Sequence, residues 1–143
     1  MSAHVLVVED AAPDVYLIRE ALKRAQLDVQ LTVFDDGEKA VTFIDELDRG
    51  AGVCPNIVLL DLNLPKRSGE MILDRIRHSG RCGQIPVVIV TSSDSPKDKA
   101  ETARLGATEY FHKPSHLSEF MELGKVVRRH LDSEHEIGAD QPV

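Results

Sequence analysis

The sequence predicts a single α/β domain built on a parallel β-sheet with helices on both faces. Short apolar runs of strand length alternate with segments of helical period over most of the chain. Three of these runs are apolar at every position, as in strands whose two faces are both buried. The length of 143 residues suits one domain. It is too short for a closed eight-unit barrel, which needs about 250 residues.

The expected strands are runs rich in Val, Ile and Leu. The second run alternates apolar and polar residues, which is typical of a half-buried strand, and the fifth is short and aromatic. The expected strands cover residues 5–8, 29–33, 57–60, 87–90 and 110–112.

Each expected strand is followed by a segment with apolar residues at helical spacing. The first begins at Pro13 and Asp14, which are favourable in a first helical turn, and the fourth ends at Gly106, a residue suited to the position after a helix. Five strand–helix units with right-handed crossovers favour a (βα)₅ flavodoxin-like sheet of strand order 2-1-3-4-5. The expected helices cover residues 13–25, 40–47, 70–78, 97–105 and 117–131.

Two segments are expected to lie outside regular structure. Residues 48–55 contain two glycines and precede a strand, so they are expected to form a loop. Residues 133–143 are polar and have no period. We therefore predict one domain over residues 1–132 and a flexible C-terminal tail over residues 133–143.

The charge balance argues against two classes of partner. Asp and Glu number 24 and Lys and Arg 17, which gives a net charge of −7. Nucleic acids and anionic membranes both attract surfaces with an excess of basic residues. No apolar run approaches the roughly 18 residues that span a bilayer, and the first residues lack the features of a signal peptide. We expect a cytoplasmic protein whose partners are neither nucleic acid nor membrane.

Cysteine and histidine residues give no sign of a zinc site. Cys54 and Cys82 are far apart and neither belongs to a CxxC pair, whereas a zinc site needs about four ligands. They are expected to be ordinary thiols of a reducing compartment. His112 and His116 are four residues apart but straddle Pro114, so they are not expected to share a metal.

Polar side chains follow four of the five expected strands: Glu9 and Asp10 the first, Asp61 the third, Thr91 the fourth and Lys113 the fifth. Singly, an acid or Thr in such a place is often a helix N-cap, and a Lys there is usually solvated. Together they meet at one edge, because the carboxyl ends of parallel strands lie on the same side. Three neighbouring carboxylates repel unless a cation holds them, and oxygen-only ligands favour Mg²⁺.

Four motifs, in this order and at this spacing, resemble those of the receiver domain of two-component response regulators, over residues 4–132. They are V-L-V-V-E-D (5–10), L-L-D-L-N-L-P-K-R-S-G (59–69), V-V-I-V-T-S-S (87–93) and G-A-T-E-Y-F-H-K-P (106–114). The segment from Glu9 to Leu22 and the insertions before Pro55 and Pro86 are most similar to small stand-alone regulators paired with bacterial phytochrome kinases.

The resemblance implies that Asp61 is the phosphoacceptor. Its carboxylate would attack the phosphorus of a phosphohistidine and form an acyl phosphate. Glu9, Asp10 and the backbone carbonyl of Asn63 would hold Mg²⁺ together with Asp61. Receivers carry either Asp-Asp or Glu-Asp at this pair, and Glu9 is a methylene longer than Asp. One of Glu9 and Asp10 could therefore bind the ion through water.

Further roles are implied near the other strand ends. Lys113 would contact the acceptor carboxylate and then a phosphoryl oxygen, and Thr91 would donate its hydroxyl to another. Tyr110 matches the family's aromatic switch, although an aromatic packed at a strand edge explains it equally well. The bond from Lys113 to Pro114 matches a cis peptide of the family. Asp14 is better explained as a first-turn helix charge than as a further metal ligand.

The favoured function is a phosphorylation switch that accepts a phosphoryl group from a partner histidine kinase, in particular a bacteriophytochrome, and is not an enzyme toward other molecules. The alternative is a small Mg²⁺-dependent phosphatase or hydrolase with Asp61 as nucleophile. It would need a nearby acid/base residue and a cap, and residues 62–64 offer no such group. A flavodoxin-like redox protein would need a phosphate-binding loop where Glu9 and Asp10 would repel the phosphate.

The output is expected to pass through a protein partner, an oligomer or onward phosphotransfer, because about a dozen residues follow the last expected helix and an output domain needs at least roughly 50. We expect a homodimer through the fourth helix, fifth strand and fifth helix, residues 97–105, 110–112 and 116–131. Phe111 points to the face opposite Tyr110 by strand alternation. One of these aromatics would then stay exposed at the sheet edge as an interface. Alternatively, Phe111 packs under the last helix against Phe120 or Met121.

Overall fold

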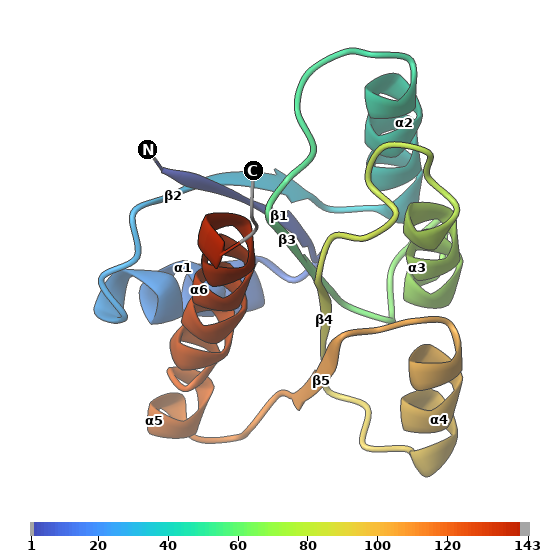
Figure 1. Ribbon diagram of the computed structural model, residues 1–143. Coiled ribbons are helices and arrows are strands. Elements are labelled where there is room, and N and C mark those ends of the chain that lie inside the picture. The colour runs from blue at the N-terminus through green and yellow to red at the C-terminus, as the bar shows by residue number, and fades with distance from the viewer. Residues whose placement is uncertain (1, 141–143) are drawn as a thin grey trace.

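The computed structural model describes the backbone of residues 2–140 and the side chains of residues 2–133. Five strands form one parallel sheet (Figure 1), and their order β2-β1-β3-β4-β5 confirms the predicted flavodoxin-like α/β fold. Each strand lies within a few residues of its predicted position. The strands are β1 (Ala3–Val8), β2 (Val29–Phe34), β3 (Ile57–Leu60), β4 (Val87–Thr91) and β5 (Glu109–His112).

Three helices begin at a residue whose side chain caps the first turn. Asp36, Ser68 and Ser95 each accept a hydrogen bond from a backbone N–H in the first turn that follows. No helix within residues 2–140 is both long and apolar enough to cross a membrane. The helices are α1 (Ala12–Arg24), α2 (Gly37–Asp48), α3 (Gly69–Arg77), α4 (Pro96–Arg104), α5 (Leu117–Phe120) and α6 (Leu123–Asp140).

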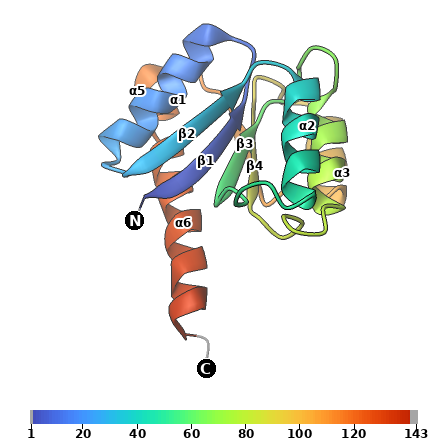
Figure 2. The same cartoon turned by 90° about the horizontal axis from the view of Figure 1, so that it is seen from above.

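The helices form two layers, one on each face of the sheet (Figure 2). Side chains of α1, α5 and α6 pack with one set of strand residues, and side chains of α2 and α3 pack with the other. The two sets alternate along each central strand: Leu59 belongs to the first and Leu60 to the second. This alternation is why β1, β3 and β4 are apolar at consecutive positions.

The C-terminal segment differs from its prediction in two ways. The expected helix over residues 117–131 is divided, because α5 ends at Phe120 and α6 begins at Leu123. Helix α6 then continues to Asp140, so residues 133–140 are helical although they carry no apolar stripe. A helix that projects from the fold needs no such stripe, since its backbone bonds are made within it (Figure 2). Residues 141–143 lie outside the described residues, and the division into a domain and a flexible tail stays a prediction.

The two cysteines form a disulfide, and the expectation of free thiols was wrong. Cys54 lies in the loop before β3 and Cys82 in the loop between α3 and β4, with 5.7 Å between their Cα atoms. Their separation of 28 residues concealed this contact. The loops meet because β3 and β4 are neighbours and start at the same edge of the sheet.

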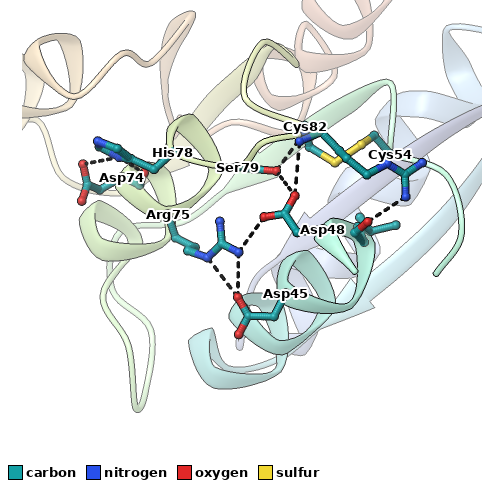
Figure 3. A network of polar contacts seen from close by, with 10 residues as sticks. Asp45, Asp48, Cys54, Asp74, Arg75, His78, Ser79 and Cys82 are labelled. Carbon is teal, nitrogen blue, oxygen red and sulfur yellow. Dashed lines mark hydrogen bonds and ion pairs between the residues drawn. A yellow bond between two sulfur atoms is a disulfide. The ribbon is translucent and has the colours of Figure 1, made fainter. Parts of the chain in front are cut away.

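A polar network lies beside the disulfide and joins α2 to α3 (Figure 3). Asp48 accepts hydrogen bonds from the Ser79 hydroxyl at 2.5 Å and from the Arg75 guanidinium at 2.7 Å. Arg75 also donates to Asp45 at 2.8 Å. The Ser79 hydroxyl in turn accepts a hydrogen bond from the Cys82 N–H. The hydrogen bond from Ser79 lowers the pKa of Asp48 to about 2, and Arg75 adds to this effect.

We predict that reducing the disulfide destabilises the protein, because the crosslink removes chain entropy from the unfolded state. For a closed loop of 28 residues the expected loss is roughly 3–4 kcal/mol. Denaturant unfolding of the protein with and without dithiothreitol measures it. The double variant Cys54→Ala/Cys82→Ala is the control, since its stability must not respond to the reductant. An equal response of both proteins would contradict the prediction.

Candidate functional site

The polar residues at the strand ends come together as predicted. Glu9 and Asp10 follow β1, Asp61 follows β3, Thr91 ends β4 and Lys113 follows β5. Because the four strands are parallel and adjacent, these residues lie at one edge of the sheet. The edge therefore carries three carboxylates, a hydroxyl and an ammonium.

The three carboxylates form a cluster that could hold a metal ion. Ligand oxygens of Glu9, Asp10 and Asp61 all lie within 4.8 Å of one another. Glu9 and Asp61 are buried, with 2% and 6% of their surface exposed, whereas Asp10 is exposed to solvent. The donor set is entirely oxygen, which fits a hard divalent cation such as Mg²⁺. Asp10 gives such an ion access from solvent.

Lys113 is the cation that two of these carboxylates, Glu9 and Asp61, contact in the structure. Its ammonium lies 2.6 Å from Oε1 of Glu9, 2.7 Å from Oδ2 of Asp14 and 3.2 Å from Oδ2 of Asp61. Burial by itself disfavours the ammonium, but the hydrogen bonds that it donates to Asp14 and Glu9 outweigh this effect and raise the pKa of Lys113 above its usual value. Lys113 is therefore charged at every physiological pH.

Burial raises the pKa of Glu9 to about 7. The hydrogen bond from Lys113 opposes this shift, while the nearby charge of Asp61 adds to it. Oε2 of Glu9 also accepts a hydrogen bond from the N–H of Ala11 at 3.1 Å. Glu9 thus changes its protonation near neutral pH, unlike an ordinary glutamate.

The two oxygens of Asp61 have different surroundings. Oδ1 accepts a hydrogen bond from the N–H of Leu62 at 2.7 Å and a longer one from the N–H of Asn63 at 3.4 Å. Oδ2 faces Lys113. Gly69 is needed beside this residue, because a Cβ at Gly69 would lie 2.3 Å from the backbone oxygen of Asp61. The carbonyl of Asn63 as a metal ligand stays a prediction.

Thr91 is fully buried, and the residues after it connect it to Tyr110. The Thr91 hydroxyl accepts a hydrogen bond from the N–H of Ser93 at 3.4 Å. The hydroxyl of Tyr110 donates to the carbonyl of Ser93 at 2.8 Å. Tyr110 is half-buried and packs with the core on the α2 and α3 side. It therefore lies where a change at Thr91 could reach it.

One expectation about the surroundings of Lys113 was wrong, and one contact of Lys113 was not expected. The Lys113–Pro114 peptide bond is trans, so the ammonium reaches the carboxylates without a cis bond. Asp14 does lie in the first turn of α1, but it is also a direct partner of Lys113. The sequence signal for this contact was weak, because the pair is 99 residues apart and an acid in a first turn is common.

His112 and His116 take no part in the cluster. The His112 ring lies 3.1 Å from the carbonyl oxygen of Ser92. His116 is the residue before the first turn of α5. Neither belongs to the metal-ligand group found within the described residues, and the expectation that they share no metal stays a prediction.

Comparison with known proteins identifies the family. Residues 5–124 match the family model of the response regulator receiver domain. The chain belongs to the response regulator receiver family. This confirms the resemblance that the four motifs carried, and it does not favour the phosphatase alternative. The family is one of signalling proteins.

Relatives in this family include regulators of phytochrome systems. The receiver is 32% identical over 120 residues to response regulator Rcp1 of Synechocystis sp., covering 83% of this chain and 82% of Rcp1. The structure of the phosphorylated cyanobacterial phytochrome response regulator RcpA matches with a TM-score of 0.83 at 28% identity, over 94% of this chain and 96% of RcpA. The Mn²⁺-bound form of Rcp1 matches with a TM-score of 0.77 at 31% identity, over 88% and 91% of the two chains. The receiver is thus close to phytochrome response regulators in sequence and structure.

We predict that Mg²⁺ binding to this receiver depends on pH through Glu9. Because the pKa of Glu9 is about 7, a cation that uses this carboxylate must displace a proton below pH 7. The apparent affinity should rise by up to about tenfold per pH unit below that pKa and level off above it. Calorimetric titrations with Mg²⁺ between pH 6 and 8 test this. Glu9→Gln should bind more weakly and with a flatter pH profile; an equal slope in both proteins would remove Glu9 from this role.

Proposed function

We propose that this receiver is a phosphorylation switch in which Asp61 accepts a phosphoryl group from the phosphohistidine of a partner histidine kinase. The placement of Asp61 is the observation that carries the proposal. One of its oxygens is held by backbone N–H groups, and the other lies beside an ammonium within an acidic cluster. Such a carboxylate is oriented for attack in one direction.

The transfer exchanges one bond to phosphorus for another. Oδ2 of Asp61 attacks the phosphorus in line, the bond between phosphorus and the histidine nitrogen breaks, and the bonding electrons return to the imidazole. The product is an acyl phosphate on Asp61, and the histidine of the kinase leaves as a neutral imidazole when its other ring nitrogen carries a proton. The receiver thereby assists only its own phosphorylation and its own dephosphorylation, in which the acyl phosphate on Asp61 is hydrolysed.

The surrounding residues offset the charge of the transferring group. We assign the coordination of Mg²⁺ to Glu9, Asp10, Asp61 and the carbonyl of Asn63, with Glu9 either direct or through water. When bound, the ion neutralises charge on the phosphoryl oxygens. Lys113 is already within reach of Oδ2 of Asp61 and would contact a second phosphoryl oxygen.

Thr91 and Tyr110 would carry the change away from the site. The Thr91 hydroxyl would donate to a phosphoryl oxygen and so leave the N–H of Ser93, to which it is bonded in the structure. The hydroxyl of Tyr110 donates a hydrogen bond to the carbonyl of Ser93. Movement of this segment would therefore alter the position of Tyr110, which supports its role as the switch.

The names of its relatives indicate which kinase. RcpA is a cyanobacterial phytochrome response regulator, and RtBRR, which matches with a TM-score of 0.74 at 31% identity over 92% of this chain and 78% of RtBRR, is a bacteriophytochrome response regulator. We therefore propose a phytochrome-type histidine kinase as the phosphoryl donor, and the cytoplasm as the place where the two proteins meet.

We predict that a small donor such as acetyl phosphate phosphorylates Asp61 only when Mg²⁺ is present. Intact-mass measurement should show one added phosphoryl group on the wild type and none on Asp61→Asn. Chelation of Mg²⁺ should abolish labelling. Asp45→Asn is the control, since Asp45 is a surface carboxylate paired with Arg75 away from the cluster. Labelling of Asp61→Asn at the wild-type rate would falsify the assignment.

A second expectation concerns Lys113→Met. This variant should bind Mg²⁺ more tightly than the wild type, because a positive charge leaves a site of three carboxylates. It should lose most of its response to the phosphoryl mimic beryllofluoride, which the ammonium would otherwise contact. Magnesium titration and the chemical shifts of Tyr110 measure the two effects. Unchanged Mg²⁺ affinity together with a normal response would contradict both.

We propose that the output face includes α4, β5, α5 and α6, and that it forms a homodimer whose strength depends on phosphorylation. Tyr110 lies on β5 at the edge of the sheet. The ammonium of Lys99 on α4 lies 5.8 Å from its ring centre, and Leu117 on α5 is half exposed. Phe111 is partly buried and packs with Phe120, with 6.0 Å between the ring centres. It is therefore not the exposed aromatic residue of this face.

Light scattering across a concentration series tests the dimer. We expect the mass to move from monomer toward dimer when beryllofluoride and Mg²⁺ are added. Lys99→Glu should weaken the shift by reversing a charge on this face, whereas Lys39→Glu on α2 should not. A monomeric mass in both states at high concentration would leave docking to a different protein as the output.

A further inference from the structure

Asp14 reaches the site from α1, a helix that contributes neither the phosphoacceptor nor any of the proposed metal ligands. Its Oδ2 lies 2.7 Å from the ammonium of Lys113. Both side chains are largely shielded from solvent: 28% of the Asp14 side chain and 10% of the Lys113 side chain are exposed. The pair is therefore a shielded contact and not a surface ion pair of little weight.

The backbone around Asp14 is held in place from the site itself. The carboxylate of Glu9 accepts a hydrogen bond from the N–H of Ala11, and the carbonyl of Ala11 accepts one from the N–H of Asp14 at 3.0 Å. Helix α1 begins at Ala12. Asp14 is thus placed in the first turn at a position fixed relative to Glu9.

The three partners of Lys113 are not equivalent. Glu9 and Asp61 belong to the oxygen cluster that could hold a divalent cation, and Asp14 does not. The ammonium is also closer to Glu9 and Asp14 than to Asp61, at 2.6 and 2.7 Å against 3.2 Å. Asp14 is therefore the partner that Lys113 can keep when a cation takes the oxygens of the other two.

We propose that Asp14 is a positioning residue of this site, which holds the Lys113 ammonium while a divalent cation takes over Glu9 and Asp61. The proposal rests on the proposed function in that it gives Lys113 and the cation separate places at the same acceptor carboxylate. Without Asp14 the ammonium has only Glu9 and Asp61 as partners. It then competes with the cation for the same oxygens.

A double-mutant cycle in the full chain tests the proposal, with Mg²⁺ affinity from calorimetry as the readout. Asp14→Asn should lower the affinity of the otherwise wild-type protein by about fivefold to tenfold, a coupling of ordinary size for residues of one charge network. In the Lys113→Met background the same substitution should change the affinity by less than about twofold, because no ammonium remains to be held. Asp14→Ala provides a second loss of the carboxylate if Asp14→Asn does not fold.

Two comparisons separate this role from a general loss of negative charge or of helix stability. Glu20→Gln removes a carboxyl group from the same helix and should leave Mg²⁺ affinity unchanged. Asp14→Glu keeps the carboxylate and should restore most of the affinity. The ¹⁵N resonance of the Lys113 ammonium, assigned by its loss in Lys113→Met, should shift in Asp14→Asn and not in Glu20→Gln.

An equal loss of affinity in both backgrounds would overturn the proposal, because Asp14 would then act through its charge alone. An unchanged affinity in Asp14→Asn would overturn it as well. The proposed function fails separately: if acetyl phosphate with Mg²⁺ does not label Asp61 in the wild type, phosphorylation is wrong while the metal-binding cycle keeps its meaning.

Discussion

The carboxylates of Glu9, Asp14 and Asp61 share the ammonium of Lys113 at the carboxyl ends of the strands, and the site depends on this shared contact. Glu9 and Asp61 are buried close together, so two negative charges there would repel strongly without a cation. The ammonium offsets that repulsion, yet burial still raises the pKa of Glu9 to about 7. A site in this state is organised for a divalent cation, whose charge would balance the carboxylates more completely than Lys113 does.

The parallel sheet makes this arrangement possible. Neighbouring strands in the order β2-β1-β3-β4-β5 end at the same edge, so residues more than a hundred positions apart, such as Glu9 and Lys113, come into contact. The loop after β3 then fixes Asp61 more closely. Backbone N–H groups hold one of its oxygens, and Gly69 lets the start of α3 approach its backbone.

At the amino-terminal ends of the strands, on the side away from the site, a disulfide and a polar network connect the elements. The disulfide and Asp48 join the loops that lead into β3 and β4, the strands that end near Asp61 and Thr91. Both strands are thus fixed at their starts by covalent and polar contacts, and their ends are left to polar residues.

The sequence by itself determined the fold, the family and the residues at the strand ends. A strand that is buried on both faces has apolar residues at consecutive positions, and here polar residues follow directly after such strands. Both patterns are local in the sequence, so they can be recognised without knowledge of tertiary contacts. The sequence alone therefore predicts that Glu9, Asp61 and Lys113 lie together at the carboxyl ends of the strands. Only the tertiary structure decided the contacts of Asp14 and the pairing of Cys54 with Cys82. In both cases the two side chains come from different loops or helices. Their separation along the chain does not indicate how close they lie in the folded protein.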